Sequence, residues 1–132
     1  MNKLLVFPLA MLALLAESGC ATYGPTWSEV SGQRYNVTDL NRRPTSVQKI
    51  DGYSSYITNP LKVEPGKHDI ELAAPAPCWT GGGPLHTMTL TLEPCMRYYL
   101  NAQFQNRVQP VWEPVIDHVE PIAGCRTNVA AK

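Results

Sequence analysis

A cysteine and a histidine on either side of a glycine run could form a nucleophile pair in this 132-residue sequence. Cys78 and His86 flank Gly81-Gly82-Gly83, and an imidazole that takes the proton of a thiol produces a reactive thiolate. No orienting acid and no nucleophile-elbow pattern accompany them, so a structural cysteine is the simpler interpretation. The glycines are not followed by Gly-Lys-Ser/Thr, so they do not predict a phosphate-binding loop.

The segment Asp117-His118-Val119-Glu120 carries three side chains that could bind a metal. In a strand, His118 and Glu120 would point to one face and Asp117 to the other. A metal site needs further ligands, and the only other histidines of the chain are distant in sequence, at His68 and His86. We therefore prefer a solvated strand edge for this segment, and we expect neither a metal nor another cofactor.

Aromatic side chains in turn-rich segments provide the remaining candidate site. Tyr53, Tyr56 and Trp79 lie in or near predicted loops, together with Trp112. Amphipathic rings on loops often contact partners, although packing in or around the core is their commoner use. We expect Trp79, Tyr53 and Tyr56 to bind an envelope protein or a glycan, and Trp79 most of all, because it precedes the three glycines.

Charge and composition exclude some classes of partner. Acidic and basic residues balance at 11 each, so the formal net charge is 0 and no basic excess indicates nucleic acid. The 12 prolines and 9 glycines are scattered, which is typical of frequent turns between short strands.

The N-terminal segment has the pattern of a secretory signal. Lys3 supplies a positive charge, and residues 4–16 form a nearly unbroken apolar run of 13 residues. A membrane-spanning helix needs about 20 such residues, so this run fits a removable signal and not an anchor. Small residues then follow at Ser18 and Gly19, directly before Cys20.

The stretch Leu15-Ala16-Glu17-Ser18-Gly19-Cys20 resembles the lipobox of bacterial lipoproteins. The resemblance implies cleavage before Cys20 and attachment of a lipid to its sulfur, which would anchor the domain to a membrane without a spanning helix. The residue after the cysteine is Ala21 and not Asp, which in lipoproteins of this kind would imply retention in the inner membrane. We therefore expect the protein in the cell envelope, at the outer membrane facing the periplasm. The alternative is ordinary secretion with cleavage before Thr22.

Seven short segments have strand patterns, and none of the chain has helical spacing. Residues 68–72, 87–93 and 97–104 alternate apolar and polar side chains, and weaker patterns cover 33–38, 46–50, 61–63 and 112–119. These segments predict an all-β fold, a small antiparallel β-sandwich of about seven short strands. Its expected core comprises Ile70, Leu72, Met88, Leu90, Leu92, Tyr98, Leu100 and Phe104.

The chain is thereby divided into four parts. We expect a lipoprotein signal peptide over 1–19, a lipidated tether over 20–31, the β-sandwich domain over 32–126 and a disordered tail over 127–132.

Strand register favours one disulfide. A hairpin of 97–104 with 112–119 brings the residues just after 119 opposite Cys95, and Cys125 lies a few positions beyond. We therefore predict a Cys95–Cys125 bridge, while Cys78 is left free, buried or paired between molecules.

The series Ile50-Asp51-Gly52, Asn59-Pro60-Leu61-Lys62-Val63 and Pro65-Gly66-Lys67-His68-Asp69-Ile70-Glu71-Leu72 resembles the PEGA-type surface-layer module. The resemblance implies a small β-sandwich that binds or scaffolds. We therefore expect a membrane-anchored envelope lipoprotein with a non-catalytic domain that contacts protein or glycan. The alternative function is a small periplasmic hydrolase or thiol/redox enzyme that uses Cys78 or the histidines.

Overall fold

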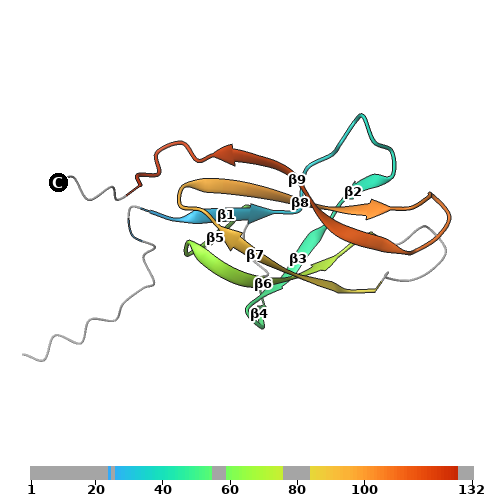
Figure 1. Ribbon diagram of the computed structural model, residues 1–132, viewed down its shortest axis with the longest axis horizontal. Helices are drawn as coiled ribbons and strands as arrows, with labels where there is room; N and C mark the ends of the chain where they lie inside the picture. Colours follow the sequence, from blue (N-terminus) through green and yellow to red (C-terminus); the bar gives the residue numbers. More distant parts are fainter. Residues whose placement is uncertain (1–23, 25, 55–58, 76–83, 128–132) are drawn as a thin grey trace, which may run out of the picture.

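A computed structural model describes residues 24, 26–54, 59–75 and 84–127. Its longer strands follow the period-two alternation of the sequence. The described residues form two packed sheets and no helix (Figure 1), so the predicted all-β sandwich is confirmed. No helix within these ranges has the length and apolar character needed to cross a membrane. The strands are β1 (Ser28–Ser31), β2 (Arg42–Pro44), β3 (Ser46–Ile50), β4 (Tyr53–Ser54), β5 (Leu61–Val63), β6 (Gly66–Ala73), β7 (His86–Leu92), β8 (Met96–Phe104) and β9 (Trp112–Pro121).

The first sheet is built around β8. Its whole length pairs with β9 on one side, antiparallel, in the hairpin register that the sequence predicted. On the other side β1 pairs with the first half of β8 and β2 with the second half. The pairing of β1 with β8 is parallel, and β5 completes the sheet beside β1.

The second sheet has the order β4-β3-β6-β7 and is antiparallel throughout. The predicted hairpin of β6 with β7 is present, with Ile70 opposite Met88. Asp51 and Gly52 join β3 to β4, and both have positive φ, at 51° and 82°. That combination is the two-residue turn that Asp-Gly favours between paired strands.

The core lies between the sheets and contains the expected alternating residues. Ile70, Leu72, Leu92, Tyr98, Leu100 and Phe104 are buried as predicted. Met88 and Leu90 are only half-buried, because β7 is an edge strand, and they pack against the margin of the core. Val30 and Trp112 complete the centre of the cluster and were not among the expected core residues.

The chain passes from the first sheet to the second at Thr45, and the missing side chain of Gly32 leaves room for this crossing. Thr45, which lies between β2 and β3, is buried and donates its backbone N–H to the carbonyl oxygen of Gly32 at 2.9 Å. Its hydroxyl donates to the carbonyl oxygen of Leu100 at 2.6 Å. A Cβ on Gly32 would lie 2.1 Å from the carbonyl oxygen of Thr45, so no larger residue fits without a backbone shift.

Two boundary predictions were wrong. The range 20–31 was expected to be a tether, yet residues 28–31 form β1, which is fully buried in the middle of the first sheet. The expected strand over 33–38 is a loop instead. β2 and β4 were not predicted as strands, since they are short and lie in polar, turn-rich sequence.

The ends of the domain differ in character. We call one end the tether end, because β1 begins there. At this end the backbone of Cys95 forms hydrogen bonds with Trp27 and with Ile122. The opposite end, the loop end, carries the loop 32–41, the tip between β8 and β9, and the adjoining ends of β6 and β7 (Figure 1).

Candidate interaction surface

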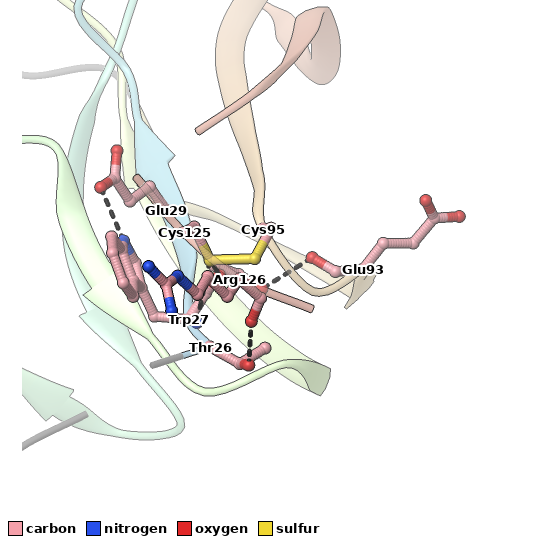
Figure 2. Close-up of a disulfide and its surroundings, with 8 residues drawn as sticks. Thr26, Trp27, Glu29, Glu93, Cys95, Cys125 and Arg126 are labelled. Atoms are coloured by element: carbon pink, nitrogen blue, oxygen red, sulfur yellow. Dashed lines mark hydrogen bonds between the residues drawn. A yellow bond between two sulfur atoms is a disulfide. The ribbon is translucent and has the colours of Figure 1, made fainter. Parts of the chain in front are cut away.

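The predicted Cys95–Cys125 disulfide is present at the tether end (Figure 2). It follows from the register, since Met96 lies opposite Pro121 and the N–H of Ile122 donates to the carbonyl oxygen of Cys95 at 2.9 Å. The N–H of Cys95 donates to the carbonyl oxygen of Trp27 at 2.8 Å. The disulfide and the backbone bonds of Cys95 therefore hold the start of β1, the start of β8 and the end of β9 together. The start of β1 and the end of β9 are separated in sequence by most of the domain.

Trp27 is held at the same end of the domain by polar contacts. Its indole Nε1 donates to Oε1 of Glu29 at 2.9 Å, and the ammonium of Lys62 lies 4.4 Å from its ring centroid. The hydroxyl of Thr26 also donates to the carbonyl oxygen of Arg126 (Figure 2). The chain is thus fixed to the domain from Thr26 onward.

The histidines do not converge. His86 makes an edge-on ring contact with Trp112, with centroids 4.3 Å apart, while His68 bonds to Asp51 in the second sheet. His118 lies on the outer face of the first sheet, 6.1 Å from the ring of Tyr99. No cluster of three potential metal ligands occurs among the described residues. Cys78 lies outside them, so its pairing with a histidine stays a hypothesis.

The expected orientation of Asp117 was wrong. Tyr99 is opposite His118, but Leu100 is opposite Ile116, so Asp117 is the extra residue of a β-bulge. The bulge turns Asp117 to the same outer face as His118, where its carboxylate accepts hydrogen bonds from Arg34, Asn36 and Arg42 at 2.8–3.2 Å.

The carboxylate of Asp117 fastens the loop 32–41 to the first sheet. Its side chain is only 1% exposed. Burial raises the pKa of Asp117, but the bonds from Asn36 and Arg42 and the charge of Arg34 outweigh it and lower the pKa below the usual value. An ionised Asp117 that two arginines neutralise is a structural anchor and not a metal ligand.

A second polar cluster on this face also has a structural role. Arg97 bridges two carboxylates, with Nε 2.6 Å from Glu29 and Nη1 3.0 Å from Glu120. The hydroxyl of Tyr99 donates to Glu120 at 2.8 Å, and this bond, with those of Arg97, lowers the pKa of Glu120. The carboxylate of Glu120 is thereby engaged by Arg97 and Tyr99, and Nε2 of His118 lies 3.8 Å from its other oxygen.

The loop end exposes apolar side chains instead. Tyr35 is 81% exposed, Leu40 is 65% exposed and Val108 is 84% exposed. Val37 and Val111 add further exposed apolar surface on the same loops, and Leu85 adds more just before β7. The backbone N–H of Phe104 donates to the carbonyl oxygen of Asn41 at 2.9 Å, which places the end of the loop 32–41 beside the β8–β9 tip.

A shallow pocket of about 370 Å³ opens beside β2 at this end. Its lining residues come from the loop 32–41, from β2 and from the segment just after β6: Tyr35, Asn36, Leu40, Arg42, Arg43, Pro44 and Pro75. Arg42 is held by Gln103 and Asp117, at 2.9 and 3.2 Å. Arg43 lies over the ring of Phe104, with its Cζ 5.0 Å from the centroid.

The predicted aromatic site is only partly described. Tyr53 lies at the start of β4 and is 80% exposed, as a contact residue requires, but it is on the turn of the second sheet and does not line the pocket. Tyr56, Trp79 and Cys20 lie outside the described residues. Sequence reasoning did not identify Tyr35, Leu40 and Arg43, although isolated apolar residues in a polar turn-rich segment were the available signal.

A comparison of the chain with protein-family models, with curated proteins and with solved structures finds no match.

Proposed function

We propose that the chain is a lipid-anchored protein of the bacterial cell envelope whose β-sandwich domain contacts another envelope component without catalysing a reaction. The observation that supports contact best is the separation of the two ends. The described N-terminal segment leaves the domain at the disulfide, and the exposed Tyr35, Leu40 and Val108 lie at the opposite end. A domain tethered at one end presents its other end to the surroundings.

The loop-end side chains have the properties of a contact surface. Exposed large apolar residues that gather on adjacent loops mark sites of interaction in a soluble domain. The carboxylates of Asp117, Glu29 and Glu120 in the first sheet are each paired with arginines, which favours a rigid support over a reactive site. The resemblance to the PEGA-type module likewise implies binding or scaffolding.

Lipid attachment at Cys20 is the first part of the proposal to test. Mass spectrometry of the protein from native membranes should find a diacylglyceryl-cysteine as the N-terminal residue. Cys20→Ser should move the protein from the membrane fraction to the soluble periplasmic fraction. An unmodified N-terminus at Thr22 would contradict the lipid anchor.

The contact surface is the second part. Tyr35→Ser and Val108→Ser should leave the thermal melting temperature within a few degrees of the parent, because both side chains are exposed. They should lower the recovery of crosslinked complexes from the native envelope. Trp79→Ala should act in the same way if its ring contributes to the surface. An unchanged set of complexes in all three variants would contradict binding by this end.

A further inference from the structure

We propose that the pocket beside β2 binds an acidic segment of another protein, in which a carboxylate contacts Arg43 and a neighbouring apolar side chain lies against Tyr35 and Leu40. This inference rests on the proposed function and names the chemistry of its partner.

The guanidinium of Arg43 makes no ion pair within the described part of the domain. Within the described ranges, its guanidinium has no carboxylate and no hydrogen-bond acceptor, and its contact is the ring of Phe104. The neighbouring Arg42, in contrast, is bound by Gln103 and Asp117. A guanidinium that rests on an apolar ring keeps its planar donors directed outward, and carboxylates bind such donors in pairs.

The other walls of the pocket favour an apolar group beside that carboxylate. Tyr35 and Leu40 project from the loop and are largely exposed, and Pro44 and Pro75 complete the apolar lining. A small anion alone would cover none of this surface. A peptide segment with an acidic and an apolar side chain would cover both parts, and would remove the apolar area from water.

The cations of this end favour a protein over a glycan. Among the described residues, two arginines and no lysine line the pocket. Lys62 and Lys67 lie toward the tether end, and Lys49 is paired with Glu71 in the second sheet. Arginine and tyrosine are enriched in protein interfaces, while lysine is depleted. A neutral glycan would leave the charge of Arg43 without a counterpart.

The test uses the full-length protein in its native envelope. A photo-crosslinking amino acid replaces Tyr35 in the pocket, Val108 on the neighbouring tip, or Lys67 toward the tether end. Each adduct is tested for sensitivity to protease and to lysozyme, and crosslinked peptides are sequenced by mass spectrometry. We expect a protease-sensitive adduct at position 35 whose partner peptide is rich in Asp or Glu.

Charge variants then examine the contact itself. Arg43→Glu should lower the yield of the position-35 adduct about tenfold, as expected for loss of a charge-assisted contact, while Arg43→Lys should retain much of it. Lys67→Glu makes the same charge change toward the tether end and should have no effect. Leu40→Asp, on an exposed side chain that folding does not need, should lower the yield as Arg43→Glu does.

Each alternative result has a defined meaning. Adducts at position 35 that Arg43→Glu and Leu40→Asp leave unchanged would overturn the acidic contact. Lysozyme-sensitive adducts would identify a glycan and overturn a protein partner, and adducts from position 108 alone would place the partner elsewhere on the loop end. In these last two cases the proposed function stands. The absence of any adduct from positions 35 and 108 would contradict both the proposed function and this inference.

Discussion

The imidazole of His68 lies between two groups that can only accept hydrogen bonds. Its Nδ1 is 2.6 Å from Oδ2 of Asp51, and its Nε2 is 2.8 Å from the carbonyl oxygen of Glu64. With Asp51 ionised, both contacts are hydrogen bonds at once only when both ring nitrogens carry a proton, so the geometry favours the imidazolium. The charged ring joins the Asp51-Gly52 turn to the turn before β6.

The first prediction is a pH dependence from this pair. Partial burial of the ring lowers the pKa of His68, but its bonds to Asp51 and Glu64 outweigh burial and raise the pKa above its usual 6.5. The stabilisation is therefore complete below the unfolded-state pKa and is lost as pH rises through the folded-state pKa. Asp51→Asn keeps a residue suited to the turn and should lower the pKa of His68 in an NMR titration of the ring protons. Glu113→Gln, at the loop end, is the control and should leave it unchanged.

The acid side has the opposite sign. The backbone N–H of Asp69 and the ring of His68 lower the pKa of Asp51 below 3.8. The contribution of Asp51 is therefore present above the unfolded-state pKa and is lost as pH falls through the folded-state pKa. A melting temperature that does not change between mildly acidic and alkaline pH would contradict the role of His68. A melting temperature that falls equally below pH 3.8 in Asp51→Asn and in the parent would contradict the role of Asp51.

The second prediction concerns Gly32. Gly32→Ala should lower the free energy of unfolding by about 1–3 kcal/mol or more, because the new Cβ meets the backbone oxygen of Thr45 and not a movable side chain. Gly24→Ala is the matched control, since nothing lies within 4 Å of a Cβ at that position. Chemical denaturation of both variants measures the difference, and equal stabilities would show that the crossing relaxes freely.

The third prediction concerns the disulfide. The bridge joins residues separated by 30 positions, and closing a loop of that length stabilises a fold by roughly 3–4 kcal/mol in the chain-entropy model. Cys125→Ser should therefore lower the melting temperature strongly, while Cys78→Ser should change it little. Peptide mapping without reduction should recover Cys95 linked to Cys125. A peptide that links Cys78 to either of them would contradict the register.

The fourth prediction contrasts two leucines that have the same strand pattern. Leu100 is fully buried in the central strand of its sheet, and Leu100→Ala should cost about 2–5 kcal/mol. Leu90 is half-buried on the edge strand β7, so Leu90→Ala should cost less, since solvent already reaches part of its side chain. Denaturation of the two variants under the same conditions checks the order, and a larger loss at Leu90 would contradict this core.

The fifth prediction tests the anchor of the loop 32–41. Asp117→Ala removes the acceptor of Arg34, Asn36 and Arg42 and should cost roughly 1–3 kcal/mol. Amide hydrogens of this loop should exchange faster, while those of β6 and β7 keep their rates. Glu113→Ala, on the exposed side of the same strand, should alter neither.

The sequence predicted well where burial is periodic. Ile70 and Leu72 on β6, and Leu100 on β8, are buried because alternate positions of these strands face the other sheet. The same periodicity fixed the hairpin of β8 with β9, and with it the pairing of Cys95 and Cys125.

The sequence did not predict β1, because its polar residues find partners far away in the chain. Ser28 donates to the carbonyl oxygen of Glu93 at 2.8 Å, Ser31 donates to Oδ1 of Asn59 at 2.7 Å, and Glu29 pairs with Arg97. Val30 is the sole apolar residue of this strand, so no alternation was visible. Tertiary hydrogen bonds, and not local pattern, make this segment a central strand.

The pattern of neighbouring residues did not predict the candidate site either. The pocket joins Pro75, just after β6, to Tyr35 in the loop 32–41 and Arg43 in β2, and Pro75 is far from the other two in sequence. The bulge at Asp117 inverts the expected direction of one side chain, and alternation cannot show an inserted residue.

The parallel pairing of β1 with β8 has a consequence for the order in which the domain assembles. Glu29 is matched with Arg97, 68 residues later, and the other neighbour of β1 is β5. β5 can therefore pair with β1 early in synthesis, whereas the other edge of β1 stays open until β8 has been made. An open strand edge can pair with other chains, and closing a long-range contact of this kind slows folding. We therefore expect a nascent chain of this protein to be prone to aggregation at the free edge of β1 until β8 is complete.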